Sequence, residues 1–344
     1  MLSRCFCVLK FPQEKSCALE EVTIDRETKI IRKFLCDRCR EKFNRMRNIR
    51  NMAARHLKIA HSVFDYINRV EEIQVKKSSD EIILFRGHAK EDYELIPSLF
   101  RKDNEKIREI EDEAIRQIEI EHPRELAGMS TLDKLVMLQH YEFPTRLLDF
   151  SFNPLVALFF AANSHKEDNG AVIICRVAKD ELLPFDNRIV KALASLAIMP
   201  NELKKEILEY DSEQLSSALT ETIFLSNGFW AMKNISDKKL SELAIKIRNR
   251  MPPDVNRIPD LSTPVFVETK LLNPRISAQK GAFLLFGMSD EFPESTQREK
   301  IIIPGKHKIT IMKELEQFGI DESNMFLSFE HFLRYLREKM KRGE

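Results

Sequence analysis

The chain has 344 residues, with 55 basic against 54 acidic side chains, so its net charge of +1 provides no global attraction to nucleic acid or to a membrane. It contains no apolar run of the roughly 18 residues that a membrane-spanning helix needs. Six cysteines in a chain this long favour a reducing cytoplasm over a disulfide framework. Nine glycines form neither a Rossmann fingerprint nor a Walker loop, which excludes the common phosphate-binding loops.

A cysteine- and arginine-rich head opens the chain. Cys36 and Cys39 form a CxxC pair, and His56 and His61 follow after a gap. A tetrahedral zinc site needs four nitrogen or sulfur ligands, often from one such turn and one helix end. We therefore expect residues 1–65 to form a zinc-finger-like module with structural zinc held by these four residues.

Two alternatives to that zinc site stay open. The first is a helical head with a CxxC that occurs by chance, and the second takes Cys5 or Cys7 as a ligand. The segment 38–58 also holds eight basic residues against one acid, Glu41, so the head is a candidate contact for RNA or DNA phosphates.

The remaining residues, 66–344, have the pattern of one larger domain. The expected helices are 62–77, 104–121, 132–141 and two in the C-terminal tail, and the expected strands are 81–85, 170–177, a stretch within 255–272, 281–287 and 300–304. Between the second of these strands and the third, from about 180 to 250, the pattern is helical. Strands interrupted by a helical insertion predict an α+β fold.

The segment 139–162 is the most informative, because a polar cluster directly precedes a very apolar run. Pro154 suits the first position of a helix, and Ser151 or Asn153 would cap it. The run LVALFFAA is too apolar for a surface helix, so we expect it to be buried. Free N–H groups at the start of such a helix favour an anionic ligand. The cluster contains His140, Tyr141, Thr145, Arg146, Asp149, Ser151 and Asn153.

Four ordered blocks of the sequence resemble the FRG domain family. They are Phe85-Arg86-Gly87 with the later Pro97-Ser98-Leu99, the segment HYEFPTRLLDFSFNPLVALFFAA, the segment PRISAQKGAFLLFG, and the C-terminal ELEQFGIDESNMFLSFEHFLRYL. The resemblance covers most of the chain.

Three elements are also similar in pattern to ADP-ribosyltransferases, which implies a split mixed sheet and NAD as the substrate. Arg86 stands where those enzymes hold the NAD phosphates, a task that suits the planar guanidinium. Ser151 matches a serine that shapes the nicotinamide pocket, and Gln279 matches the first residue of the catalytic motif. Gly281 stands where the catalytic Glu would be, so Glu268 or Asp149 is the candidate replacement acid.

Each of these residues also has a structural interpretation. For Arg86 it is an ion pair, for Ser151 a helix cap and for Gln279 a turn. For Arg146 and Asp149 it is a pair with each other. The residues expected to contact the cofactor are Arg86, Gly87, His88, His140, Tyr141, Thr145, Arg146, Asp149 and Ser151, with the histidines also candidate proton carriers.

Two functions are therefore expected from the sequence. The first is an NAD-dependent ADP-ribosyltransferase that acts as a bacterial toxin or phage-defence effector, with RNA or DNA as an acceptor and a cognate inhibitor or antitoxin protein as a partner. The second is a non-enzymatic FRG module that senses a nucleotide or anion and binds its partner through the head. They differ in whether Arg86, Ser151 and Gln279 line one cleft that contains a carboxylate.

Overall fold

The computed structural model describes residues 58–224, 230–232, 237–255, 257–268 and 281–325. The chain divides into two units, Met1–Lys58 and Ile59–Glu344. Apart from Lys58, the first unit lies outside the described residues, and with it lie the predicted ligands Cys36, Cys39 and His56. The fourth predicted ligand, His61, belongs to the second unit.

A seven-stranded mixed sheet organises the second unit, with strand order β4-β7-β8-β2-β1-β3-β9. Its neighbouring strands are antiparallel, except for the parallel pair of β4 and β7. Together with the helices around it, this sheet confirms the predicted α+β class. The strands are β1 (Glu81–His88), β2 (Leu147–Ser151), β3 (Gly170–Ala178), β4 (Leu182–Pro184), β7 (Val265–Glu268), β8 (Gly281–Leu285) and β9 (Gln297–Ile303).

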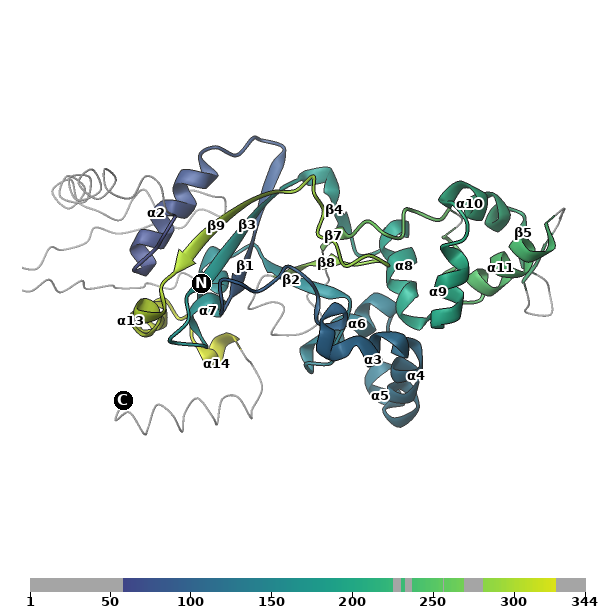
Figure 1. The fold of residues 1–344 in the computed structure, drawn as a ribbon, viewed down its shortest axis with the longest axis horizontal. Helices are drawn as coiled ribbons and strands as arrows, with labels where there is room; N and C mark the ends of the chain where they lie inside the picture. Colours follow the sequence, from purple (N-terminus) through teal and green to yellow (C-terminus); the bar gives the residue numbers. More distant parts are fainter. Residues whose placement is uncertain (1–57, 225–229, 233–236, 256, 269–280, 326–344) are drawn as a thin grey trace, which may run out of the picture. The chain divides into compact units, whose positions relative to one another are not determined.

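The sheet is weakest between β1 and β2. β1 pairs with β3 along its whole length, and β2 does the same with β8. Between β1 and β2 the only register pair is Phe85 with Ser151. Figure 1 shows the two halves, β9-β3-β1 and β2-β8-β7, on either side of this junction. The sheet therefore opens at its centre.

Three helices cover one face of the β1-β3-β9 half. They are α2 (Val63–Gln74), α7 (Pro154–Ala162) and α13 (Gly305–Glu316), and their apolar side chains form one core with those of the three strands. The Tyr66 hydroxyl of α2 donates to the carbonyl of Pro154 at 2.9 Å, which ties α2 to the start of α7. A separate core on the opposite face includes Leu84, Leu148 and Phe150.

Helix α7 is the buried helix predicted from the apolar run. Six of its nine residues are buried. Asn153 Oδ1 accepts the N–H of Leu155 at 3.0 Å, so Asn153 is the cap, and Ser151 Oγ accepts the N–H of Asn153 at 2.9 Å. Both candidate caps therefore help to shape the turn from β2 into α7.

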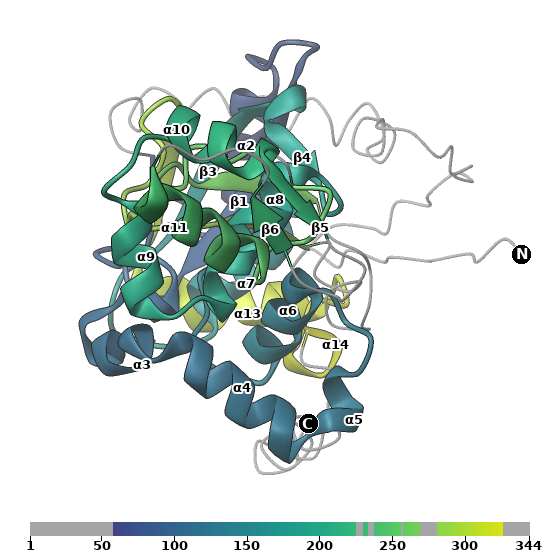
Figure 2. The ribbon, with the colours of Figure 1, turned by 90° about the vertical axis from the view of Figure 1, so that its right-hand side faces the viewer.

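A helical insertion connects the two parallel strands β4 and β7. It contains α8 (Arg188–Ser195), α9 (Asn201–Ile207), α10 (Ser212–Thr220), α11 (Lys238–Arg248) and the hairpin of β5 (Thr222–Phe224) and β6 (Trp230–Met232). These elements group together in Figure 2. The helical pattern predicted over 180–250 lacks β4 and the hairpin, since three-residue strands are too short to show an alternation.

Other helix boundaries differ modestly from the sequence prediction. The charged helix is divided into α3 (Glu105–Glu109) and α4 (Glu111–Glu121), because Ile110 between them has φ −115° and ψ 27°. The short α5 (Pro123–Leu126) follows. Helix α6 (Thr131–His140) begins at a capping box. No helix in the described part of the chain is long and apolar enough to cross a bilayer.

Candidate functional site

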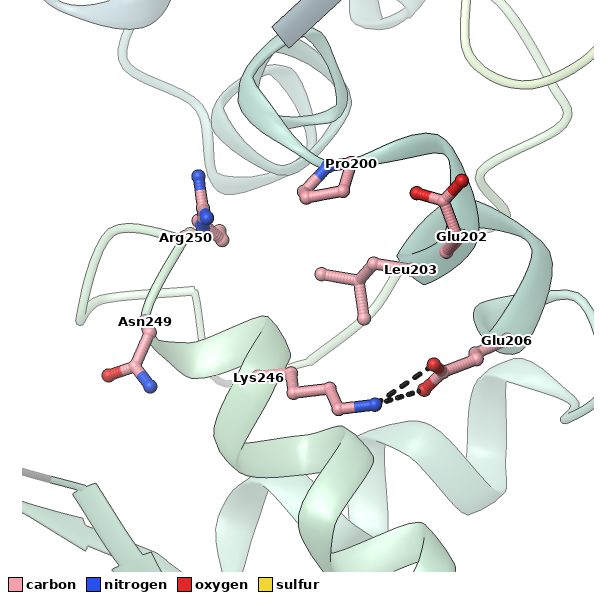
Figure 3. Close-up of a pocket in the computed structure, with 7 residues that line it drawn as sticks. All are labelled: Pro200, Glu202, Leu203, Glu206, Lys246, Asn249 and Arg250. Carbon is pink, nitrogen blue, oxygen red and sulfur yellow. Dashed lines mark hydrogen bonds and ion pairs between the residues drawn. The ribbon is translucent and has the colours of Figure 1, made fainter. Parts of the chain in front are cut away.

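One pocket, of about 370 Å³, lies in the insertion. Lys246 on α11 pairs with Glu206 on α9 at 2.7 Å across it, as Figure 3 shows. Arg250 at its edge donates to the carbonyl of Ile198. Lys246 and Arg250 are thus already bonded to other groups of the protein. None of the residues singled out in the sequence lines this pocket.

A second pocket, of about 190 Å³, lies where β1 and β2 separate, and it gathers five of the predicted site residues, Arg86, Gly87, His140, Asp149 and Ser151. Polar groups and an apolar wall share it. It is lined by Phe85, Arg86, Gly87, Val136, Gln139, His140, Asp149, Phe150, Ser151, Val156, Ala157, Phe160 and Phe283.

Arg86 spans the opening in the sheet. Its Nη1 donates to the Asp149 carbonyl at 2.7 Å and lies 3.8 Å from the Asp149 carboxylate, and its Nε donates to His88 Nε2 at 3.0 Å. Burial lowers the pKa of Arg86, while the Asp149 carboxylate raises it. A guanidinium stays charged under such conditions, so Arg86 contributes a mostly buried positive charge to the pocket.

His88 accepts the hydrogen bond of Arg86 as a neutral ring. Burial, and then the positive charge of Arg86, lower the pKa of His88 to about 3. Since Nε2 accepts the Arg86 hydrogen bond, the ring proton must be on Nδ1. His88 is not among the residues that line the pocket. The lowered pKa of His88 does not favour the role of proton carrier near pH 7 that the sequence suggested.

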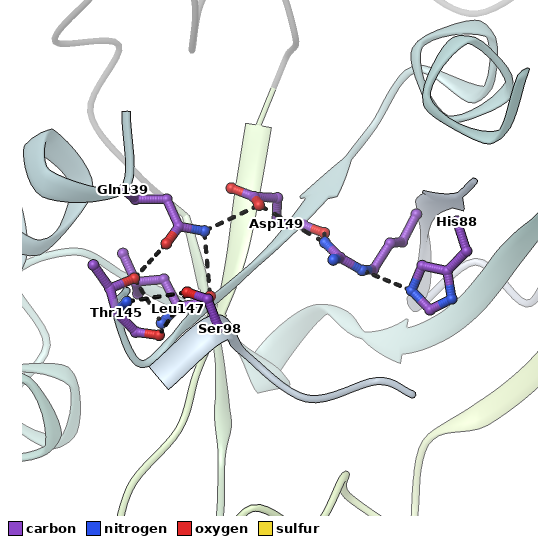
Figure 4. Close-up of polar contacts among 7 residues, drawn as sticks. His88, Ser98, Gln139, Thr145, Leu147 and Asp149 are labelled. Carbon is purple, nitrogen blue, oxygen red and sulfur yellow. Dashed lines mark hydrogen bonds and ion pairs between the residues drawn. The ribbon is translucent and has the colours of Figure 1, made fainter. Parts of the chain in front are cut away.

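Gln139 and Thr145 hold the Asp149 side chain from the other side, as Figure 4 shows. Gln139 Nε2 donates to Asp149 Oδ2 at 3.0 Å and to the Leu147 carbonyl at 3.3 Å, and Thr145 donates a short hydrogen bond to Gln139 Oε1. Ser98 Oγ in turn accepts the N–H of Thr145 at 3.1 Å. Buried Thr145 serves this network and does not line the pocket.

Gly87 permits α7 to lie directly against β1. A Cβ on Gly87 would stand 2.0 Å from the Ala157 carbonyl oxygen and 2.7 Å from the Ala161 nitrogen. Only glycine fits such a close approach. The contact brings Ala157 and Phe160 to the pocket, so the glycine of the aromatic-Arg-Gly motif determines the shape of its apolar wall.

Arg146 does not reach the pocket. It is 3 % exposed and bonds both carboxylate oxygens of Glu111, as well as the carbonyls of Phe286 and Gly287 at 3.2 and 2.7 Å. Lys204 of α9 also bonds Glu111, at 3.0 Å. The structure therefore assigns Arg146 a structural role, with Glu111 and not Asp149 as its partner.

The remaining predicted residues lie in different surroundings. His140 lines the pocket, but Tyr141 is 71 % exposed and does not. Glu268 is exposed at the end of β7 and is likewise absent from the pocket lining. Gln279 lies outside the described residues, although Gly281, two residues later, pairs with the pocket-lining Ser151.

Sequence reasoning overlooked Gln139 as a site residue, together with Phe283. Gln139 directly precedes His140, the first residue of the polar cluster, on the same helix, and that proximity was the only signal available. Phe283 belongs to an apolar segment, where sequence alone does not separate a pocket wall from a core.

The aromatic-Arg-Gly motif in β1 and the polar turn into buried α7 thus form one structural unit, with the pocket between them. Residues 81–170 match the FRG domain family. This confirms the FRG resemblance over that range, while the two later blocks lie outside the matched residues. No curated protein and no solved structure matches the chain. Nearly all the residues that line the FRG pocket come from the matched range, with Phe283 the exception.

Proposed function

We propose that the FRG pocket binds NAD and that the protein is an ADP-ribosyltransferase. The observation that carries this proposal is the meeting of Arg86, Ser151 and the Asp149 carboxylate in one pocket at the opening of the sheet. Arg86 and Ser151 are the two described residues whose pattern resembles that of the transferases. The sequence has Gly281 where the transferases have their catalytic Glu, and the Asp149 carboxylate beside Arg86 and Ser151 is the candidate replacement acid.

The size of the pocket suggests which end of NAD enters. Its volume of about 190 Å³ is below the roughly 300–1,000 Å³ usual for sites that enclose a whole drug-sized ligand. A nicotinamide ring and part of its ribose suit this volume. Phe160 and Phe283 offer apolar surface for the ring, and Arg86 would bind the pyrophosphate outside it.

Asp149 is the best-placed acid for the reaction. Its side chain is 53 % exposed and lies beside Arg86, whereas Glu268 is absent from the pocket. When the bond from the ribose to nicotinamide breaks, its electrons leave with nicotinamide and positive charge develops on the ribose. A fixed carboxylate stabilises that charge. The acceptor then bonds to the ribose carbon and releases a proton.

The biological part of the proposal follows the sequence expectation. Transfer to RNA, DNA or protein would make the protein a toxin or phage-defence effector, controlled by a cognate inhibitor. One observation favours the alternative of a nucleotide-sensing module: Gly281, at the usual position of the catalytic Glu, is held in β8 opposite Ser151 and provides no acid.

Release of nicotinamide from labelled NAD, with mixed RNA, DNA and protein as acceptors, tests the proposal. Asp149→Asn should reduce turnover about 100-fold or more, as loss of an electrostatic stabiliser does. Glu268→Gln is the matched control and should retain wild-type turnover. If NAD binds but neither wild type nor variant turns it over, the sensing module is the correct account. If Glu268→Gln alone loses activity, Asp149 is not the acid.

A further inference from the structure

The hydrogen bonds of the Gln139 side chain are not explained by its place in helix α6. It lies near the end of α6, half-buried, and bonds neither a helix terminus nor an ionic partner of α6. Its amide instead connects Thr145 to the Asp149 carboxylate of the neighbouring strand. Every bond of this side chain is thus directed towards β2 and its entry turn.

The direction of the Gln139 amide is determined by the backbone. Thr145 Oγ1 accepts the N–H of Leu147 at 3.3 Å, so its own hydrogen is free to be donated to Gln139 Oε1. A reversed amide would place its oxygen against the Leu147 carbonyl and Asp149 Oδ2, which are both acceptors. Gln139 Nε2 must therefore face Asp149.

We infer that Gln139, oriented by Thr145, is a positioning residue that fixes the Asp149 carboxylate at the mouth of the FRG pocket. This inference rests on the proposed function for its catalytic consequence. An exposed aspartate on a strand otherwise samples several rotamers. Gln139 on one side and Arg86 at 3.8 Å on the other hold Asp149 over the opening between β1 and β2.

Paired substitutions separate this role from a general contribution to the fold. Thr145→Val keeps the volume but removes the hydroxyl, and Thr145→Ser restores it. Gln139→Met removes the amide, with Gln117→Met as the matched control, since Gln117 bonds only Glu121 on the exposed face of α4. All four proteins are to be assayed for kcat and KM with NAD and examined as crystals without ligand.

Thr145→Val and Gln139→Met should each lower kcat between about 10-fold and 100-fold with KM for NAD changed less than about twofold, because a misplaced group costs turnover more than binding. Thr145→Ser and Gln117→Met should stay close to wild type. In crystals of the first two variants the Asp149 carboxylate should leave its place beside Arg86. The inference is overturned if Asp149 keeps its position in both variants. It is also overturned if the wild type is active and the two variants keep its kcat. A wild type without turnover removes the proposed function alone, since the position of Asp149 still decides the role of Gln139.

Discussion

The FRG motif is explained residue by residue by its place in β1. Phe85 is buried in the core beneath α7 and pairs with Ser151 at the last point where β1 and β2 meet. Arg86 replaces the missing strand pairing by donating to the Asp149 carbonyl. Gly87 admits α7. Each residue type is thus required by a different feature of the same opening in the sheet.

His88 gives a prediction at this scale, because it is 3 % exposed and stays neutral in the folded protein. Below its usual pKa of 6.5 the unfolded chain binds a proton on this ring, whereas the folded protein binds one only near pH 3. The folded state should therefore lose up to about 1.4 kcal/mol per pH unit on acidification through this window. Stability rises again as the pH returns to 6.5.

Urea unfolding at several pH values measures this effect. His88→Gln should show a shallower dependence of the unfolding free energy on pH between 6.5 and 3 than wild type. The exposed His122 is the control, and His122→Gln should retain the wild-type slope. Equal slopes for wild type and His88→Gln would show that His88 does not remain neutral in the folded state.

Among the elements, α7 links the fold to the site. It begins at the turn that Ser151 and Asn153 shape, and it packs against β1 through Gly87. Its residues Val156, Ala157 and Phe160 line the pocket. A small displacement of α7 would therefore change the pocket and the core together.

Gly87→Ala should reveal this dependence. The added methyl cannot fit at 2.0 Å from a backbone oxygen, so α7 must shift, at a cost of about 1–3 kcal/mol or more. Gly128→Ala is the comparison, because Gly128 has φ 73° with open space around it and should lose only about 1–2 kcal/mol from backbone strain. Thermal unfolding measures both variants. NAD binding should weaken in Gly87→Ala alone, and unchanged binding there would contradict the coupling of α7 to the pocket.

At the scale of the whole molecule, the chain divides along its sequence into two units, with the boundary between Lys58 and Ile59. The predicted zinc site falls on this division, since His61 lies past it. His61 is exposed, 3.6 Å from Asp65, with its ring 4.9 Å from that of His307. The zinc site stays a prediction.

Metal analysis of the purified protein tests it. One equivalent of zinc per chain is expected, and chelation should unfold the head, since metal binding provides the folding free energy of such small modules. The second unit has its own extensive cores and should keep its unfolding temperature. If the purified protein contains no metal and its head is folded all the same, the zinc finger is excluded. If chelation unfolds the whole chain, the two units are not independent.

The sequence predicted best those features that depend on local pattern. The apolar run after Pro154 identified α7 as a buried helix, and the ordered polar residues before it identified part of the pocket. Arg146 was misjudged because its partner Glu111 lies 35 residues earlier, on a helix whose charged pattern resembles a solvated surface. The role of Gln139 depends on the meeting of α6 with β2, which no local pattern reveals.

The central claim is that the opening between β1 and β2 is the place where NAD binds. A crystal structure of the Asp149→Asn protein soaked with NAD tests this most directly, because the substitution preserves the shape of the pocket while slowing turnover. We predict density for the nicotinamide ring against Phe160 and Phe283, with the pyrophosphate beside Arg86. Density for NAD elsewhere on the protein, or an empty pocket at saturating NAD, would contradict the account.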